Sequence, residues 1–169
     1  MEIWQLYDDE GNETDKVIKR GEKIPDGYHF HCIEAWIVNE KKEVLLTKRH
    51  PDKPSYPLYW EPTGGGVVKD EDSKDAAIRE VLEETGISID EKNFYYMGRY
   101  MGNTYMIDTY IYILRGSFYP ELKLQEEEVV DYQWVPIDEL DKVDKIMEEK
   151  VTRFLDYFPK IKKNCCFHF

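Results

Sequence analysis

Residues 64–86 constrain the fold of this chain most strongly, because a run of glycines leads into a segment with helix start and stop signals. The segment opens with three consecutive glycines and closes at Gly86. Asp72 and Ser73 are candidate N-caps, and a glycine is the common residue just beyond a helix end. We therefore predict a helix over residues 73–85, preceded by a loop whose backbone other groups can approach closely.

Three carboxylates share one face of this predicted helix within about one turn; they are Glu80, Glu83 and Glu84. The opposite face is expected to pack on the core and carries Ile78, Val81, Leu82 and Thr85. Ala76 and Ala77 flank the acidic row with methyl groups only, so a loop or ligand can approach it closely. Because clustered like charges repel one another, the row predicts a nearby cation.

Oxygen ligands of this kind suit Mg²⁺ or Mn²⁺, which retain several waters and bridge to substrate phosphates. The predicted helix has no cysteine and no pair of histidines, which argues against zinc. Arg79 lies four residues before Glu83 and is placed to pair with it. The competing interpretation of the same residues is a solvated acidic helix face that binds nothing.

The charge balance limits the class of partner. The 169 residues include 23 Lys+Arg and 35 Asp+Glu, giving a formal charge of −12, which argues against binding to a nucleic-acid polymer. Without a long apolar run or a basic, apolar N-terminal leader, we expect no membrane association and a cytoplasmic location. Three cysteines are too few for a disulfide framework. A homodimer remains possible.

Strand and turn patterns surround the predicted helix. The expected strands cover residues 3–7, 16–19, 28–38, 43–49, 95–100, 105–114 and 129–135. Residues 50–62 contain four prolines and predict an irregular loop. Helical periodicity returns over residues 137–158, with a break expected near 143–145. The sequence predicts one mixed α/β domain with a sheet between helices, and the first two strands as a β-hairpin appendage.

The glycine and helix segment resembles a known family signature. Gly65, Glu71 and residues 79–87 match every fixed position of the signature of the Nudix hydrolases, and residues 58–66 and 129–135 also resemble that family's flanking segments. The resemblance covers roughly residues 28–140. It implies an α/β/α sandwich with a mixed β-sheet between helices, plus the N-terminal hairpin. Residues 1–169 then form a single domain, divided into a hairpin extension (1–27), the Nudix core (28–140), and a C-terminal helix and tail (141–169).

The resemblance also implies an activity. Members cleave a diphosphate linkage in a nucleoside diphosphate-X, or a related small organic diphosphate, by attack of water with Mg²⁺ or Mn²⁺. Carried over to this chain, the implied metal ligands are Glu80, Glu83, Glu84, the carbonyl of Gly64 or Gly65, and Glu128. Arg79 then orients a glutamate. The family places its base either in the signature or on a distant loop, so Glu80 or Glu83 is preferred and Glu127 or Glu128 stays open.

Further residues are candidates for contact with the substrate. Lys48 and Arg49 end a strand beside the loop and are candidate phosphate clamps, with ordinary surface charge as the alternative. Tyr56 and Trp60 are candidates for stacking on the substrate, with core packing an equal alternative for Trp60. Glu127 is a further candidate in the acidic run 126–128, which reads equally well as a solvated turn.

A second resemblance involves the N-terminal third of the chain. Residues 4–12, 28–31 and 35–39 resemble the branch of the family related to isopentenyl-diphosphate isomerase. That isomerase needs a catalytic cysteine and a neighbouring histidine in a loop that here reads Glu-Pro-Thr-Gly-Gly-Gly, so isomerase activity is disfavoured. His29 and His31 are then expected to be packed or hydrogen-bonded strand residues. A non-catalytic ligand sensor of the same fold remains the other alternative.

The C-terminal sequence Cys-Cys-Phe-His-Phe, residues 165–169, is a weak candidate for metal binding because it lacks a second ligand pair at zinc-like spacing. We expect a frayed or packed terminus there instead.

Overall fold

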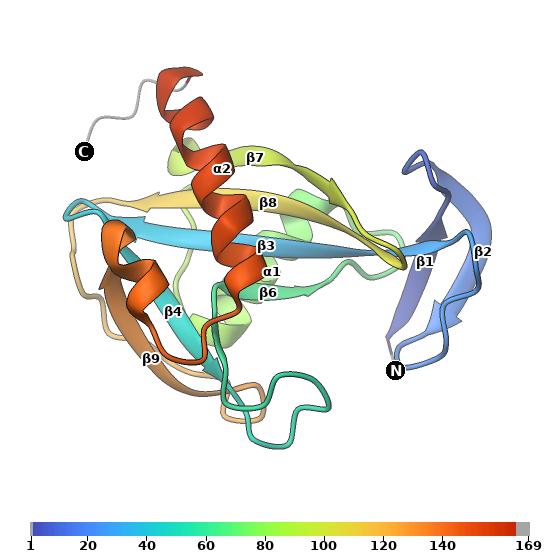
Figure 1. The fold of residues 1–169 in the computed structure, drawn as a ribbon, viewed down its shortest axis with the longest axis horizontal. Helices are drawn as coiled ribbons and strands as arrows, with labels where there is room; N and C mark the ends of the chain where they lie inside the picture. Colours follow the sequence, from blue (N-terminus) through green and yellow to red (C-terminus); the bar gives the residue numbers. More distant parts are fainter. Residues whose placement is uncertain (1, 165–169) are drawn as a thin grey trace.

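The computed structural model describes residues 2–164 and shows a nine-stranded mixed sheet between two helices. Helix α1 (Ser73–Thr85) covers one face and α2 (Glu148–Asn164) the other, as Figure 1 shows. This is the expected α/β/α sandwich. The strands are β1 (Ile3–Tyr7), β2 (Glu13–Lys19), β3 (His29–Asn39), β4 (Glu43–Arg49), β5 (Trp60–Glu61), β6 (Thr63–Gly66), β7 (Phe94–Met101), β8 (Tyr105–Leu114) and β9 (Val129–Pro136).

The predicted elements are confirmed to within a few residues at their ends. The break expected near residues 143–145 lies between a short 3₁₀ helix, η2 (Ile137–Lys142), and α2; another, η1 (Glu91–Asn93), precedes β7. Neither α1 nor α2 is long and apolar enough to cross a membrane. The expectation of a frayed or packed tail at residues 165–169 falls outside the described part of the chain.

Strand β6 was not predicted, because glycines have a low strand propensity. Its strand conformation comes from antiparallel pairing with β3, which runs from Cys32 opposite Gly66 to Ala35 opposite Thr63. The glycine run is therefore an edge strand and not the expected loop.

Strand β3 organises the sheet, and its two neighbours separate along its length. It pairs in parallel with β8 over ten residue pairs, from Phe30–Tyr105 to Asn39–Leu114. Strand β4 pairs with β3 only at Val38–Val44 and then follows β9 away from it (Figure 1). The widening space between β3 and β4 holds β5 and β6.

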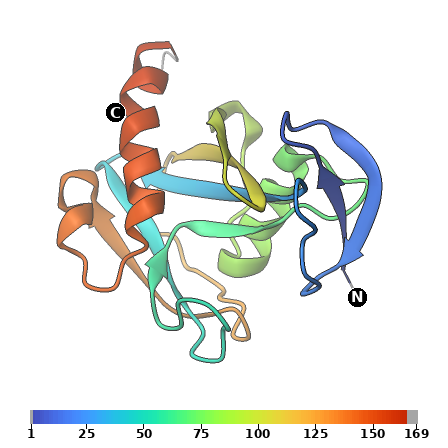
Figure 2. The ribbon, with the colours of Figure 1, turned by 45° about the vertical axis from the view of Figure 1, so that its right-hand side comes forward.

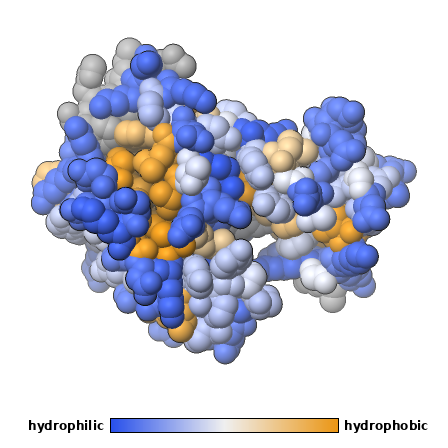
Figure 3. Space-filling model, viewed as in Figure 1, coloured by the Kyte–Doolittle hydropathy of each residue, from blue (hydrophilic) through white to orange (hydrophobic). Residues whose placement is uncertain are grey.

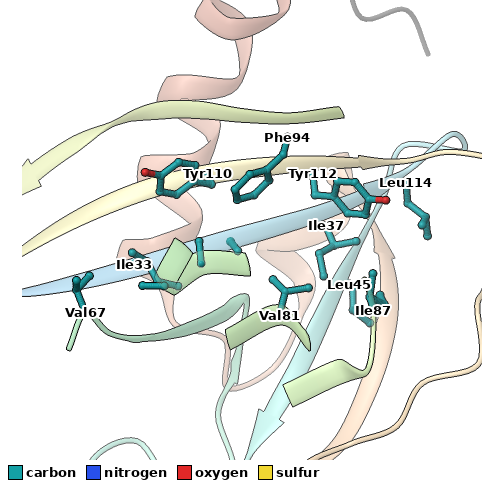
Figure 4. Packing of buried hydrophobic residues seen from close by; sticks show 13 residues of the cluster. Ile33, Ile37, Leu45, Val67, Val81, Ile87, Phe94, Tyr110, Tyr112 and Leu114 are labelled. Atoms are coloured by element: carbon teal, nitrogen blue, oxygen red, sulfur yellow. The ribbon is translucent and has the colours of Figure 1, made fainter. Parts of the chain in front are cut away.

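Alternation along β3 produces one hydrophobic cluster on each face of the sheet. Ile33 and Ile37 face α1 and pack with Val81 (Figure 4). Trp36 faces α2, where its ring stacks on Phe154 with centroids 4.3 Å apart. Because both faces are covered, β3 is buried along most of its length and fixes the positions of both helices.

Helix α1 has the predicted ends but a different buried face. Asp72 caps it by accepting a hydrogen bond from the Asp75 amide, and Gly86 follows in the left-handed conformation at φ 76°. With Glu80 at 0°, Ala77, Val81 and Glu84 lie at about 60°, 100° and 40°, and all three are buried.

The expectation that the acidic row lies opposite the core is therefore wrong, since Glu84 lies in the middle of the buried face. Ala76 and Ala77 belong to the core cluster and do not border an open surface. Leu82, at about 200° on the helical wheel, is 50% exposed. Helical angles show which residues share a face of the helix, but packing on the sheet decides which face is buried.

The N-terminal hairpin belongs to the sheet and is not an appendage. Strand β1 pairs with β2 as expected and also with β3, at Leu6–Phe30 and Tyr7–His29. Leu6 is fully buried. The finer division of the chain at residues 27 and 140 stays a prediction.

A buried ionic network joins β3, β7 and β8. Asp108 is 1% exposed and accepts hydrogen bonds from Arg99 at 2.7 and 2.8 Å, and its Oδ2 lies 2.8 Å from Nε2 of His31. Burial raises the pKa of Asp108, but hydrogen bonds from Arg99 and His31 outweigh it, so the net pKa lies below the ordinary value. The ionised carboxylate is thus the form that the fold stabilises.

Replacing Asp108 by Asn should lower the free energy of unfolding by about 2–4 kcal/mol at pH 7, because the charged partner of Arg99 is lost. A lowered folded-state pKa stabilises the protein above the unfolded value, about 4, and this contribution is lost as pH falls through the folded value. Urea unfolding of both proteins should therefore show the same difference from pH 7 to about 4 and a smaller one at pH 3. A difference that grows at pH 3 would contradict this assignment.

Gly86→Ala tests the end of α1. A Cβ at Gly86 would lie 2.9 Å from Cβ of Lys123, whereas a Cβ at Gly116, with a similar φ of 78°, meets nothing within 4 Å. Both substitutions incur the left-handed strain of about 1 kcal/mol, and only Gly86→Ala adds a steric clash. Urea unfolding should show Gly86→Ala to be less stable than the Gly116→Ala control by about 1 kcal/mol. Equal losses would show that the neighbouring loop yields freely.

Candidate active site

A cleft of about 910 Å³ opens where β3 and β4 separate. Figure 2 shows how β6, the long loop before β5 and the N-terminal hairpin are arranged relative to one another. Its walls come from β3, β6, the loop of residues 50–58, the last turn of α1 and the first two turns of α2. Segments distant in the sequence therefore meet around the glycine run.

Arg79 is the centre of an ion-pair cluster at one side of this cleft. Its guanidinium donates to both carboxylate oxygens of Glu71 at 2.8 and 2.9 Å, to Glu80 at 2.7 Å and to the carbonyl of Gly66 at 3.2 Å. The predicted pair with Glu83 is present at 3.3 Å. The hydrogen bonds that Arg79 donates to Glu71 are the largest cause that raises the pKa of Arg79, so this cation stays charged.

Arg79 therefore orients Glu80 more firmly than Glu83. The role of Glu71 was missed in the sequence, although Glu71 occupies a fixed position of the signature. It holds the guanidinium from the side away from the helix face.

Gly65 allows Glu80 to approach the β6 backbone closely. A Cβ built on Gly65 would lie 2.2 Å from the carboxyl carbon of Glu80, so a side chain there would force the carboxylate to move. The carboxylate thus lies directly against the β6 backbone. Burial raises the pKa of Glu80, and Arg79 acts in the opposite direction.

Glu84 is a buried carboxylate without an ion-pair partner in the described part of the chain. It is 8% exposed and lines the cleft, and no residue within 2–164 hydrogen-bonds or ion-pairs with its side chain. Burial raises the pKa of Glu84 well above its ordinary value and the negative charges of Glu61 and Glu80 raise it further, while the cations Lys150 and Lys53 offset only part of this rise. A carboxylate left in this state is costly unless a cation joins it.

The donor set fits a hard divalent cation. Glu80 supplies carboxylate oxygens against the backbone of Gly65, and Glu84 lines the same cleft as the glycine run; oxygen is the ligand that Mg²⁺ and Mn²⁺ prefer. In the conformation described for residues 2–164, no three His, Cys, Asp or Glu side chains are grouped closely enough to hold an ion. Ligation by these glutamates would therefore need side-chain rotation, which the exposed Glu83 permits.

A second ion-pair cluster, missed in the sequence, forms another wall of the cleft. Glu61 is 9% exposed and accepts hydrogen bonds at 2.5 Å from both Arg49 and Lys150. Burial raises the pKa of Glu61, but Lys150 and Arg49 together lower it more, so the net pKa lies below the ordinary value. The two cations are thus fixed facing the cleft.

Lys150 reaches the cleft because the chain before α2 adds to β5. The Trp60 amide donates to the carbonyl of Lys145 at 2.8 Å, and the Met147 amide donates to the carbonyl of Trp60 at 2.9 Å. This pairing forms only in the folded chain, so the sequence near residue 150 does not indicate that Lys150 reaches the cleft. It explains why Lys150 and Arg153 were not candidates.

The structure separates the predicted substrate contacts into two groups. Arg49 and Tyr56 line the cleft. Lys48 and Trp60 instead line a different pocket of about 560 Å³ beside η2, where the Lys48 ammonium lies 5.3 Å from the Trp60 ring centroid. Successive residues of a strand point to opposite faces, so Lys48 and Arg49 could not both face the cleft.

The two candidate glutamates in the acidic loop before β9 also differ in position. Glu128 lines the cleft and forms an ion pair with Lys53, which ties this loop to the proline-rich loop. Glu127 is exposed and makes no hydrogen bond or ion pair with any residue of the described chain. The metal and base roles considered for these glutamates stay predictions.

The expectation for the strand histidines is confirmed. Nε2 of His29 lies 2.9 Å from Asp9, and Nε2 of His31 lies 2.8 Å from the buried Asp108. Both rings are buried on the side of β3 away from the cleft.

Glu61→Gln should destabilise the protein by about 2–4 kcal/mol, because two buried cations lose their carboxylate while the side-chain volume is kept. Glu127→Gln removes the same charge from an exposed position without a partner and should change stability by less than about 0.5 kcal/mol. Urea unfolding of both variants at neutral pH measures the difference. Equal stabilities would show that the Glu61 cluster contributes nothing to the fold.

Comparison with known proteins agrees with this architecture. Residues 32–157 match the NUDIX domain model. An uncharacterized Nudix hydrolase of Listeria monocytogenes is 35% identical over 170 residues, and one of Listeria innocua is 34% identical over 170 residues; each alignment covers 100% of both chains. A crystal structure from Deinococcus radiodurans shares the fold, with a TM-score of 0.76 at 14% identity over 93% of this chain and 99% of that one. The glycine strand, the carboxylate helix and these matches show that the chain belongs to the Nudix hydrolase family.

Proposed function

We propose that this protein hydrolyses a diphosphate linkage in a nucleoside diphosphate-X or a related small organic diphosphate, with Mg²⁺ or Mn²⁺ as cofactor. The observation that carries the proposal is Glu84, a buried carboxylate in the cleft that has no hydrogen-bond or ion-pair partner within residues 2–164 and lies near the negative charges of Glu61 and Glu80. A diphosphate bound with a divalent cation supplies the positive charge that this carboxylate lacks. The same negative field disfavours a phosphate that arrives without a cation.

The cleft also carries cations that suit the phosphate groups. Arg49, Lys53 and Lys150 line it, and each is held by a glutamate, Glu61 or Glu128. Fixed cations of this kind orient a diphosphate and neutralise the charge that develops on the leaving oxygen. When bound, the divalent cation would lower the pKa of a coordinated water and polarise the phosphoryl group.

The proton of the attacking water needs an acceptor, and the two preferred glutamates differ in their freedom. Glu80 is held by Arg79 at 2.7 Å, which suits a ligand of fixed orientation. Glu83 has a single 3.3 Å contact with Arg79 and a side chain that is 46% exposed, which suits a group that accepts and releases a proton. We therefore propose Glu83 as the base and Glu80 with Glu84 as metal ligands, with the carbonyl of Gly64 as a further ligand.

A panel assay tests the activity. Purified protein is incubated with Mg²⁺ and a set of nucleoside diphosphate compounds, and phosphate is measured after a phosphatase is added. Cleavage of at least one compound, dependent on the divalent cation, is the expected result. Binding of a compound without turnover would favour the non-catalytic sensor, and conversion of an isoprenyl diphosphate without hydrolysis would favour the isomerase.

Glu83→Gln and Glu84→Gln should each lower kcat by about 100-fold or more, as loss of an acid–base group or a metal ligand does. In the absence of metal, Glu84→Gln should leave stability unchanged or raise it, because an uncompensated buried charge is removed. Glu121→Gln, at an exposed glutamate outside the cleft, is the matched control and should retain wild-type kcat. A wild-type rate in both variants would remove the main support for the hydrolase; marked destabilisation by Glu84→Gln would instead assign that residue a structural role.

A further inference from the structure

The N-terminal hairpin forms one wall of the active-site cleft. The Lys69 amide, just after β6, donates a hydrogen bond to the carbonyl of Ile3 at 2.8 Å, so β1 is joined to the β6 side of the cleft as well as to β3. Trp4 and Arg20 of the hairpin both line the cleft. Figure 3 shows this face of the molecule hollowed between the main body and the hairpin.

Trp4 begins an aromatic surface that continues along the cleft floor. Its ring stacks on Phe30 with centroids 4.7 Å apart and planes at 10°, and Phe30 in turn contacts Tyr105, with centroids 6.4 Å apart. A Cβ at Gly66 would lie 2.9 Å from Nε1 of Trp4. The indole therefore lies against the end of the glycine strand, within reach of a ligand that extends from it.

A polar pair is set into the same floor. Phe30, Cys32 and Glu34 point to the cleft face of β3, because they are two residues apart. Glu34 is 1% exposed and forms an ion pair with Arg153 of α2. Its Oε2 accepts no hydrogen bond from any residue in the described chain, nor does Nε of Arg153 donate one.

The floor discriminates between kinds of ligand. An aliphatic chain placed on it would leave the unpaired oxygen and N–H without a partner, which is costly in a buried site. A flat ring joined to the diphosphate through a sugar would stack on the aromatic groups, and the sugar hydroxyls would donate to Glu34. Glu34 lies opposite Gly64, and the four residues from it to Phe30 span about 13 Å, enough for a sugar and a ring beyond a diphosphate at the glycine strand.

We propose that Trp4 is a specificity-determining residue, which stacks on a flat ring at the far end of the diphosphate substrate. The proposal rests on the proposed function for the position of the diphosphate, and it adds the hairpin as the wall that selects the attached group. Glu34 is the acceptor for the sugar that joins this ring to the diphosphate.

Binding measurements test this without requiring turnover. Guanosine 5′-diphosphate carries a flat base with N–H donors, and inorganic pyrophosphate has the diphosphate alone. Titration calorimetry in Mg²⁺ should show Trp4→Leu weakening the binding of guanosine diphosphate by about tenfold or more, as loss of ring stacking does, with pyrophosphate binding changed by less than about twofold. Tyr119→Leu, an exposed ring outside the cleft, is the matched control and should change neither.

Trp4→Phe is a second variant that keeps the test valid if Trp4→Leu misfolds. It preserves an aromatic ring in the same place, so it should fold and retain most of the affinity. The wild-type protein should show a change in tryptophan fluorescence on adding guanosine diphosphate, and Trp4→Phe should lose most of that change. Glu34→Gln should weaken guanosine diphosphate binding and spare pyrophosphate.

Three results would overturn the proposal: no binding of guanosine diphosphate by wild type, equal affinity in Trp4→Leu, or equal weakening for both ligands. A failure of the proposed hydrolase activity has a different signature. In that case the panel assay shows no turnover, while the ligand discrimination by Trp4 is still measured by calorimetry.

Discussion

The pairing of β3 is the constraint on which the rest of the structure depends. Over its first half β3 is bonded to β6 and β8, and at its end it is bonded to β4. A strand has only two hydrogen-bonding edges, so β3 cannot pair with β4, β6 and β8 at the same residues. Strand β4 therefore pairs with β3 only beyond the end of β6. The cleft is the result of that exchange, and Glu61, the last residue of β5, lies at the point where the two parts of the sheet separate.

The charges of the site form two ion-pair clusters of opposite net charge and one unpaired carboxylate. Arg79 pairs with Glu71 and Glu80 on the α1 side, and Glu61 pairs with Arg49 and Lys150 on the other. Glu84 lies between them and has no hydrogen-bond or ion-pair partner within residues 2–164. Because burial makes an unpaired carboxylate expensive, an imbalance of this kind is difficult to explain as a stabilising feature, and it is consistent with a site that binds a cation.

Most strands and the limits of α1 were predictable because their signals are local. Caps at Asp72 and Gly86 and alternation along β3, β4 and β8 depend on neighbouring residues only. Strand β6, the burial of Glu84 and the exposure of Leu82 were not predictable, since each depends on a partner from elsewhere in the chain. Trp60 shows the same limit: it is next to Glu61 in sequence, yet the strand directs it to the opposite face.

By itself, the sequence determined the family, the carboxylate helix and the class of chemistry, because these depend on residue types at fixed spacing. Only the tertiary structure decided which residues share the cleft. It showed that Lys48 and Trp60 lie outside the cleft, and that Glu61, Lys150, Glu34 and the hairpin residue Trp4 line it. The physical reason is that spacing along a helix or strand fixes directions over a few residues, whereas the meeting of β1, β3, β5 and α2 depends on contacts between residues up to 119 positions apart, such as Glu34 and Arg153.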